Sequence, residues 1–430
     1  MKVCFFTLGC KVNQQETAAM INIFKKAGYE VVHGEEAADV YVVNSCTVTL
    51  NGDRKSIQWI RRARRQNPEA VIALCGCMPQ AFPQKAIDVE EADIIIGSKG
   101  KGEILNLVNQ FRENRERHID IVPHSERDKF EELASETDAL HTRAFLKIQD
   151  GCNRECAYCI IPKARGRVRS RPVDSIVEEA KKMAAAGHKE IVLTGVNISC
   201  YGQDLGNNVC DAIEAVAEIE EVKRIRLGSL ELDLFTDEML VRMSKVEKFC
   251  PHFHLSLQSG SDKTLKNMNR LYDTQLYTDM MNRLRELFDK PSFTTDIIVG
   301  FPQETENDFL DSVAYMQKCR FMRVHCFSYS QRPGTKGAAM PGQIDNATKS
   351  ARNKIMTYKS EQVRDSVYSE YIGFEEEALL EQKTADGFFT AYTKRYIPVL
   401  VKDNGYSAGD IVKVKLTGIN GGKMSCEVIE

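Results

Sequence analysis

Residues 1–110 alternate short runs of apolar, often β-branched residues with longer segments of mixed polarity. The runs KVCFFTLGC, DVYVVNSC, AVIALCGC and ADIIIGS predict buried strands, and QQETAAMINIFKKAG predicts a helix after the first of them. Strands that alternate with helices and are apolar on both faces are typical of a parallel sheet covered on each side. We therefore expect a doubly wound α/β domain with a mostly parallel sheet over residues 1–112.

A second series of apolar runs begins at residue 143. It consists of RAFLKIQ, KEIVLTG, RIRLGSLE, HFHLSLQSG, FTTDIIVGFP and RVHCFSYS. About one helix and its loops separate each run from the next, which predicts six βα units with right-handed crossovers. Because a closed barrel of this kind needs eight units, we expect an open (βα)6 partial barrel over residues 143–368.

Two further segments complete the expected organisation. Residues 113–142 are heavily charged and lack long apolar runs, so we expect a linker there. After a helical stretch near 345–371, the chain continues in short runs with two-residue alternation, separated by turns rich in Gly, Asn and Asp. This pattern predicts a small antiparallel β barrel, of the oligonucleotide-binding type, over residues 369–430.

The composition narrows the class of protein. With 43% hydrophobic and 28% charged residues, the chain is typical of a soluble globular protein. The N-terminal residues MKVCFFTLGCKVNQ do not follow a signal-peptide pattern, and no uncharged apolar run reaches the roughly 18 residues of a spanning helix. We therefore expect a cytoplasmic protein with no membrane partner, in which 14 cysteines serve as ligands, catalytic groups or core residues rather than disulfides.

Three cysteines follow the first strand of the expected partial barrel at C-x3-C-x2-C spacing. Cys152, Cys156 and Cys159 lie in the polar loop DGCNRECAYC, which argues against three buried structural cysteines. A zinc site usually takes a fourth Cys or His at comparable spacing, and none follows nearby. Three thiolates suit a 4Fe–4S cluster whose fourth iron stays open for a small ligand.

This motif resembles that of the radical S-adenosylmethionine superfamily, and the resemblance implies that the open iron binds S-adenosylmethionine. An aromatic residue precedes the third cysteine, and the strand ends LTGVN, LGSLE and DIIVGFPQE resemble segments that contact the cofactor's amino group, ribose and adenine. The cofactor contacts implied in this way are Tyr158, Thr194, Gly195, Asn197, Ser229, Glu231, Ile298, Gly300 and Glu304. Barrels of this kind place their sites at the carboxyl ends of the strands, where these segments lie.

A second set of cysteines lies in the N-terminal domain. Cys10, Cys46 and Cys77 each come shortly after an expected strand. The carboxyl ends of parallel strands share one edge of the sheet, so these residues should converge in space. The alternative is that each is a buried apolar residue, the usual role of a free cysteine. Cys75 competes with Cys77 because both have the same strand parity, and we prefer Cys77 because Gly76 places it beyond the strand.

The segments LGCKVNQ, NSCTVT and CGCMPQ, followed by the radical core and a TRAM-type β tail, resemble the methylthiotransferases over almost the whole chain. The resemblance implies that Cys10, Cys46 and Cys77 hold a second 4Fe–4S cluster, where sulfur is methylated by one S-adenosylmethionine. A second S-adenosylmethionine is then cleaved to a 5′-deoxyadenosyl radical, which removes hydrogen from the carbon that receives the methylthio group. The resemblance also implies a reductant protein such as a flavodoxin or ferredoxin, and a sulfur donor that no motif identifies.

The stretch LGCKVNQ resembles the MtaB-type branch, which acts on N6-threonylcarbamoyladenosine next to the tRNA anticodon, at position 37. Two residues depart from that pattern: Gln15 stands where tyrosine is common, and Gln303 stands where glycine is common. Other substrates remain open, namely isopentenyladenosine in tRNA or an aspartate of a ribosomal protein. A third hypothesis is an iron–sulfur or RNA-binding scaffold without turnover, which does not account for the strand ends that resemble cofactor-binding segments.

Basic residues support binding to a tRNA anticodon stem-loop. The net charge of −3 means that any contact with RNA comes from local patches. Arginines alternate in ARGRVRSR, so an extended chain would point them all to one side, and the tail carries two further cations beside Tyr396. The RNA contacts expected from these patterns are Arg165, Arg167, Arg169, Arg171, Lys394 and Arg395.

Overall fold

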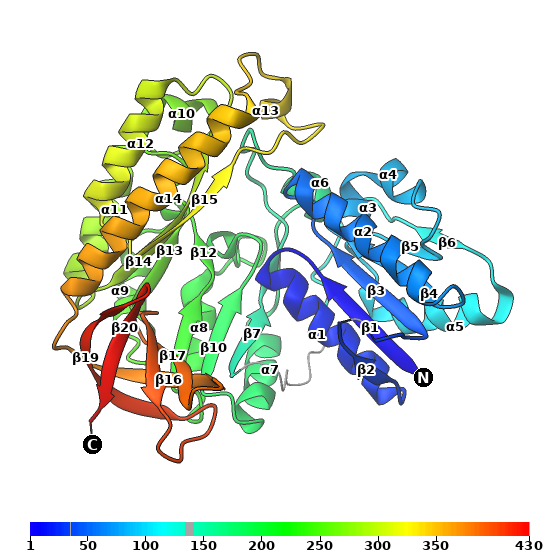
Figure 1. Cartoon of the computed structure of the whole chain (residues 1–430), viewed down its shortest axis with the longest axis horizontal. Coiled ribbons are helices and arrows are strands. Elements are labelled where there is room, and N and C mark those ends of the chain that lie inside the picture. The colour runs from blue at the N-terminus through cyan, green and yellow to red at the C-terminus, as the bar shows by residue number, and fades with distance from the viewer. Residues whose placement is uncertain (35, 134–141, 430) are drawn as a thin grey trace.

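The computed structural model describes residues 1–34, 36–133 and 142–429. A sheet domain at the N-terminus lies beside a larger half-open barrel, and a small β barrel at the C-terminus closes one end of the larger one (Figure 1). All three expected architectures are confirmed. The eight residues 134–141 of the expected linker lie outside the described residues.

The N-terminal domain is built on six parallel strands in the order β2-β1-β3-β4-β5-β6. The strands are β1 (Lys2–Thr7), β2 (Glu30–Val32), β3 (Val40–Ser45), β4 (Val71–Gly76), β5 (Ile94–Ile96) and β6 (His118–Asp120). One face packs on α1 (Lys11–Lys26) and α5 (Ile104–Asn114), and the other on α2 (Leu50–Gln66), α3 (Cys77–Ala81) and α4 (Pro83–Ile87). Strand β6 falls inside the expected linker, so the sheet extends beyond residue 112.

The central part is a curved array of parallel strands with helices on its outer side (Figure 1). Its strands are β7 (Arg143–Lys147), β10 (Glu190–Thr194), β11 (Arg224–Leu227), β12 (Ser229–Leu230), β13 (His252–Leu255), β14 (Ser292–Val299) and β15 (Arg323–Ser328). Gly228 separates β11 from β12, which together form the third of the six expected strands. The outer helices include α7 (Val173–Ala185), α8 (Val209–Ala217), α9 (Asp237–Ser244), α11 (Thr274–Leu287) and α12 (Glu306–Cys319).

Shorter elements decorate the carboxyl ends of these strands. They are β8 (Gln149–Asp150), α6 (Ile161–Arg165), β9 (Arg169–Ser170), η2 (Ile198–Cys200), η3 (Leu232–Leu234), α10 (Asp262–Asn267) and α13 (Lys336–Ala339), while η1 (Lys101–Glu103) belongs to the N-terminal domain. The long helix α14 (Asn346–Ser369) then runs back along the barrel to the C-terminal part (Figure 1).

The C-terminal part is a closed five-stranded barrel in the order β16-β17-β18-β20-β19. Its strands are β16 (Glu375–Lys383), β17 (Phe388–Thr393), β18 (Pro398–Lys402), β19 (Ile411–Asn420) and β20 (Lys423–Val428). Alternate residues point into an apolar core, as the two-residue pattern predicts. The run GFFTAYTKRYIPVLV divides into β17 and β18 at a turn, where Tyr396 has a φ of 64°.

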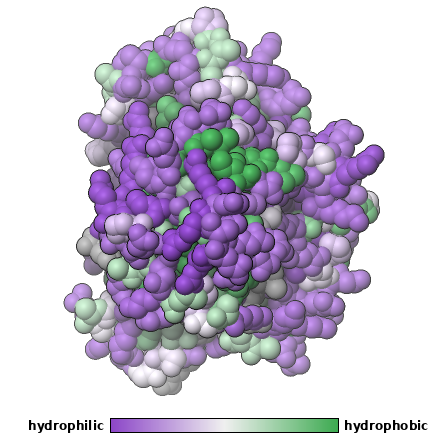
Figure 2. Space-filling view, turned by 90° about the vertical axis from the view of Figure 1, so that its right-hand side faces the viewer, coloured by the Kyte–Doolittle hydropathy of each residue, from purple (hydrophilic) through white to green (hydrophobic). Residues whose placement is uncertain are grey.

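Figure 2 shows the side of the molecule on which the N-terminal domain lies. This surface is mostly hydrophilic and has one compact hydrophobic patch. None of the helices in the described part of the chain combines the length and the apolar character that crossing a membrane requires.

Candidate functional site

The three N-terminal cysteines lie at the carboxyl ends of three neighbouring strands. Cys10 is the N-cap of α1 after β1, Cys46 follows β3, and Cys77 begins α3 directly after β4. Successive strands are added on one side of β1 (β2) and then on its other side (β3 onward), so the strand order reverses between β1 and β3, which is where open parallel sheets bind ligands.

Two glycines bring these cysteines close together. Gly9 has a φ of 111°, and a Cβ there would lie 2.8 Å from Cys46 Cβ. Gly76 has a φ of 101°, and a Cβ there would lie 2.6 Å from the carbonyl oxygen of Ser45. Both positions therefore need glycine, for backbone conformation and for space, so that Cys10 and Cys77 can turn off their strands beside Cys46.

The thiols of Cys10, Cys46 and Cys77 interact electrostatically with one another. Burial, together with the neighbouring Cys77, raises the pKa of Cys46 to about 12. The Cys10 side chain is exposed at the surface, yet the crowding of its thiol raises its pKa, which Arg165 opposes and Cys77 reinforces. Cys75 instead packs into the apolar core between the sheet and helices α1 and α5, as its position inside the strand explains.

The arrangement suits a cluster better than a single ion. Within the described residues, no three His, Cys, Asp or Glu side chains are placed to hold one metal ion. A 4Fe–4S cluster binds each thiolate through a separate iron, so its ligands surround it without meeting at one point. Three thiols that influence one another but do not form a single-ion site fit that geometry.

Arg165 connects the N-terminal cysteines to the partial barrel. Its Nε donates a hydrogen bond to Cys77 Sγ over 3.2 Å, and its Nη2 lies 2.5 Å from Asn13 Oδ1. Cys77 also packs against Ile160, the residue after Cys159, through the contact of α3 with α6. The two cysteine sets therefore approach the same domain boundary from opposite sides.

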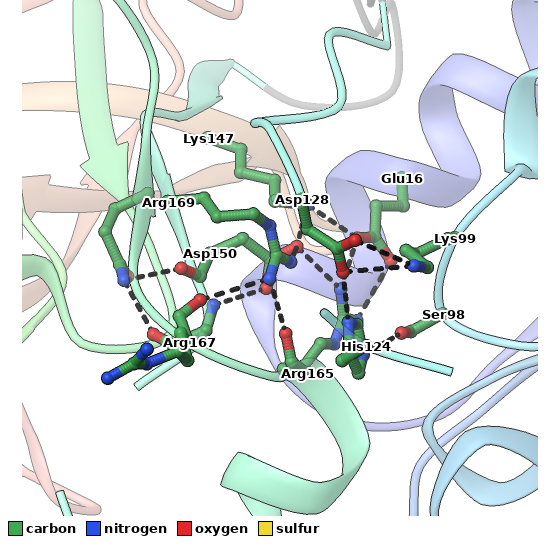
Figure 3. Close-up of polar contacts among 12 residues, drawn as sticks. Glu16, Ser98, Lys99, His124, Asp128, Lys147, Asp150, Arg165, Arg167 and Arg169 are labelled. Carbon is green, nitrogen blue, oxygen red and sulfur yellow. Dashed lines mark hydrogen bonds and ion pairs between the residues drawn. The ribbon is translucent and has the colours of Figure 1, made fainter. Parts of the chain in front are cut away.

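A buried group of charges surrounds Arg165 at this boundary (Figure 3). Glu16 accepts from Arg165 over 2.5 Å and from Lys147 over 2.8 Å, and Asp150 lies 2.6 Å from Lys147. Burial alone would raise the pKa of Glu16, but Arg165 and the two neighbouring lysines hold it well below its usual range. The complete group has two carboxylates and four cations: Glu16, Asp150, Lys101, Lys147, Arg165 and Arg169.

This surplus of buried positive charge lies beside the Cys77 thiol. Buried charges are tolerated where opposite charges compensate them. Thiolates bound to a cluster would bring negative charge to the place where Arg165 already donates to sulfur. The charge balance therefore fits an anionic metal cluster at Cys10, Cys46 and Cys77.

The expected row of RNA-binding arginines is corrected by the structure. Arg165, Arg169 and Arg171 are buried and ion-paired. Arg165 ends helix α6, so the row is not one extended chain, and Arg169 and Arg171 pair with Asp150 and Glu179 inside the protein. Only the Arg167 side chain is largely exposed, at 65%, and its guanidinium lies 2.5 Å from Glu126. Figure 3 shows Arg167 at the edge of the buried group.

The two cations of the tail also have protein partners. The ammonium of Lys394 lies 3.3 Å from Glu377, and its side chain is half-buried. Arg395 pairs with Glu376 and donates to the carbonyl oxygens of Lys290 and Asp289. Arg395 thus joins the C-terminal barrel to the central part, and its expected role in RNA binding stays a prediction.

The second cysteine set lines a cavity of about 120 Å³ at the carboxyl ends of the barrel strands. Its lining includes Cys152, Cys156 and Cys159. Burial raises the pKa of Cys159 to about 12, and the charge of the nearby Cys156 acts in the same direction. The other lining residues are Arg154, Tyr158, Ile161, Val196, Asn197, Ser229, Glu231, Ser256, Gln258 and Arg270.

A polar network connects the cavity wall to the cysteines. Arg270 Nη1 lies 3.1 Å from Cys156 Sγ and 2.5 Å from Glu231 Oε1. Glu231 also accepts from Asn197 over 2.8 Å and from Arg154 over 2.9 Å. Two buried atoms on this wall, Arg270 Nη2 and Asn197 Oδ1, have no hydrogen-bond partner among the residues that the structure describes. A donor and an acceptor left free beside three thiols fit a polar ligand such as an amino acid moiety.

The predicted cofactor contacts divide into two groups. Tyr158, Asn197, Ser229 and Glu231 line the cavity. Thr194, Gly195, Ile298, Gly300 and Glu304 do not line it. Glu304 is buried, accepts from Gly300 N over 2.9 Å and pairs with Arg352 over 2.7 Å. Its carboxylate therefore holds the loop after β14, and its expected contact with the cofactor is corrected.

Sequence reasoning missed four polar residues of the cavity: Arg154, Ser256, Gln258 and Arg270. Arg154 lies inside the cysteine motif, and Gln258 follows a strand in HFHLSLQSG. Both positions therefore already indicated that these side chains lie near the site. Gln258 also has a φ of 70°, a conformation uncommon for this residue type and often found at functional sites. Arg270 follows a short helix and belongs to no motif that would have revealed it.

Comparisons with known proteins cover nearly the whole chain. Residues 146–316 match the Radical SAM superfamily, and residues 2–97 match the uncharacterized protein family UPF0004. The threonylcarbamoyladenosine tRNA methylthiotransferase MtaB of Bacillus subtilis is 39% identical over 96% of this chain and 93% of its own length. A tRNA-2-methylthio-N(6)-dimethylallyladenosine synthase of Pelotomaculum thermopropionicum is 30% identical over 97% of this chain and 95% of its own.

A solved structure shares the fold at low sequence identity. The radical S-adenosylmethionine methyltransferase TsrM of Kitasatospora setae, with cobalamin and a 4Fe–4S cluster bound, superposes with a TM-score of 0.56. The match covers 90% of this chain and 77% of that protein at 12% identity.

Proposed function

This chain belongs to the radical S-adenosylmethionine methylthiotransferases of the MtaB type, and we propose that it adds a methylthio group to C2 of N6-threonylcarbamoyladenosine at position 37 of tRNA. The observation that carries this proposal is the presence of two cysteine triads, one on each side of a single domain boundary. One triad lies in the N-terminal sheet domain and the other lines the cavity of the partial barrel. A sulfur-transfer reaction initiated by a radical needs two such sites within reach of one substrate.

We assign Cys152, Cys156 and Cys159 to one 4Fe–4S cluster, and Cys10, Cys46 and Cys77 to the other. When bound, these cofactors supply the reductive cleavage of S-adenosylmethionine and the sulfur atom, which no side chain can supply. The protein's own contribution is binding and orientation. Arg270 and Asn197 each offer a free buried polar atom to the amino acid part of the cofactor, and Glu231 fixes both side chains.

The partners follow from this assignment. The tRNA is the substrate, and we propose a small reductant protein such as a flavodoxin or ferredoxin as the electron donor, in the cytoplasm where tRNA is modified. A substrate with an isopentenyl group on the adenosine is the second candidate, because a dimethylallyladenosine synthase is also similar over the whole chain.

Mass spectrometry of nucleosides tests the function. Purified protein with both clusters, S-adenosylmethionine and a reductant should convert N6-threonylcarbamoyladenosine in an anticodon stem-loop to its 2-methylthio derivative. The same stem-loop carrying isopentenyladenosine should give little product. Efficient conversion of the isopentenyl substrate and none of the threonylcarbamoyl substrate would establish the second candidate instead.

Arg167 is the expected RNA contact that remains exposed. Its contribution to the salt dependence of tRNA binding can be measured. It lines a surface pocket of about 470 Å³ together with Cys152 and Glu126. Replacing Arg167 with alanine should weaken tRNA binding and lower the slope of log affinity against log salt by roughly 0.7 to 0.9 for one lost phosphate contact. The Glu126→Ala variant is the matched control and should leave the slope unchanged or steeper. An unchanged slope for the arginine variant would remove Arg167 from the RNA surface.

A further inference from the structure

Two guanidinium groups lie over the ring of Tyr396, and a third cation, Lys11, acts on it electrostatically. The guanidinium of Arg143 in β7 lies 5.1 Å from the ring centroid, and that of Arg226 in β11 lies 4.9 Å from it. Burial would raise the pKa of Tyr396, but Arg143, Lys11 and Arg226 together lower it. The charge of Lys11, in the N-terminal domain, is therefore close to two guanidinium groups of the partial barrel.

Two of these cations form ion pairs with carboxylates, whereas Lys11 forms none within the described residues. Arg143 Nε lies 2.7 Å from Glu381, and Arg226 Nε lies 2.8 Å from Glu190. In residues 1–34, 36–133 and 142–429, no carboxylate lies within ion-pair distance of the Lys11 ammonium. The side chain of Lys11 has an exposed surface that a ligand can reach, although its ammonium lies in a crowded setting, where burial followed by Arg143 and Arg226 lowers its pKa.

The local fold does not account for this charge either. Lys11 is the first residue of α1, where the helix dipole is positive and favours acidic residues, and the first turn contains none. Its ammonium lies 5.7 Å from the ring of Phe145 in β7 and contributes to lowering the pKa of His252 in β13 and of His325 in β15. The free positive charge thus faces the inner side of the partial barrel.

We propose that Lys11 binds the carboxylate of the threonyl group on the substrate adenosine and thereby determines substrate specificity. This inference rests on the proposed function, because it concerns the same site. On adenine, C2 and the N6 substituent flank N1 on one edge of the ring. A residue that holds the N6 substituent must therefore lie beside the group that delivers sulfur to C2, and Lys11 directly follows Cys10.

The charge also explains how a dimethylallyl substituent would be rejected. A threonylcarbamoyl group ends in a carboxylate, which pairs with the ammonium while Arg143 and Arg226 add positive potential around it. An apolar group would displace water from Lys11 and leave the ammonium without a partner. Sites built for a polar group discriminate strongly against analogues that lack it.

The experiment compares two anticodon stem-loops that differ only in this carboxylate. One carries N6-threonylcarbamoyladenosine and the other its methyl ester, and binding of each fluorescent RNA is measured by anisotropy. The wild-type protein should bind the acid roughly tenfold or more tightly than the ester, the effect of one hydrogen-bonded charge. Lys11→Met should bind both RNAs with the affinity that the wild type has for the ester, and Lys11→Arg should keep most of the preference.

Lys25→Met, at the exposed C-terminal end of the same helix, is the matched control and should bind like the wild type. Iron content and the unfolding midpoint of the Lys11 variants should equal those of the wild type, which would show that the neighbouring cysteine site is intact.

Several outcomes would overturn the inference. If Lys11→Met kept the wild-type preference for the acid, Lys11 would not be the carboxylate site. If Lys11→Met weakened acid and ester equally, Lys11 would contact a phosphate of the RNA, since both RNAs share those phosphates. Failure of the proposed function looks different, because a wild-type protein that preferred the acid but formed no methylthio product would overturn that function and still support the carboxylate site.

Discussion

Replacing Cys152, Cys156 and Cys159 together with alanine should abolish both the cleavage of S-adenosylmethionine and the methylthiolation of tRNA. The physical reason is that this triad lines the cavity in which Arg270 Nη2 and Asn197 Oδ1 have no hydrogen-bond partner within the described part of the chain, so a ligand can bind there. Bound iron should fall from about eight to about four atoms per chain, since one of two 4Fe–4S clusters is lost. Iron analysis and chromatographic detection of 5′-deoxyadenosine measure both effects.

Cys200→Ala is the matched control for this variant. Cys200 is buried in η2 and lies near enough to Cys152 that the two thiols influence each other. It lacks the spacing of the triad, so its removal should leave the iron content near eight atoms. Loss of a cluster in the Cys200 variant, or of all iron in the triple variant, would show that the ligand set is wrong.

Replacing Cys10, Cys46 and Cys77 with alanine should separate the two activities. This variant should still form 5′-deoxyadenosine, because the other triad and its cavity are unchanged, but tRNA should carry no methylthio group. Iron should again fall to about four atoms. The sharp contrast between intact cofactor cleavage and absent sulfur transfer is the result that assigns sulfur delivery to the N-terminal domain.

Cys75→Ala provides the control for the N-terminal triad. Its thiol lies in the same strand but packs into the apolar core, so the variant should lose some stability and keep both activities. Cys77 needs a further control, because its removal also takes an acceptor from Arg165. Were Cys77→Ser to retain cofactor cleavage while the triple variant lost it, the loss would come from the disturbed Arg165 and not from the missing cluster.

Much of the architecture could be predicted because it depends on local pattern. Apolar runs identified the six barrel strands, and even the break at Gly228 is visible in RIRLGSLE. The convergence of Cys10, Cys46 and Cys77 could be predicted from one rule, namely that the carboxyl ends of parallel strands share an edge. Strand β6 could not, because three residues at a sheet edge within a charged stretch carry no clear periodicity.

The wrong predictions concern charged residues whose partners are distant in sequence. Arg165 resembles a surface arginine in the sequence, and only the fold brings Glu16, 149 residues away, to its guanidinium. The resemblance of DIIVGFPQE to a cofactor-binding segment places Glu304 at the cofactor, whereas in the fold Arg352 and Gly300 use its carboxylate. Whether a charge faces solvent, a ligand or a buried partner is decided by tertiary contacts, which local pattern does not contain.

The buried charges around Glu16 also affect how the N-terminal domain folds while the chain is being synthesised. Glu16 leaves the ribosome long before its partners Lys147 and Arg165, which follow 131 and 149 residues later. At roughly 5–20 residues per second, the nascent N-terminal domain waits for several seconds after Lys101 is made, with Lys101 as the first of these cations beside Glu16. The last stage of folding of the first domain is therefore set by the translation of the second, and a pause in translation between them would prolong the period in which an incompletely neutralised carboxylate lies exposed to solvent.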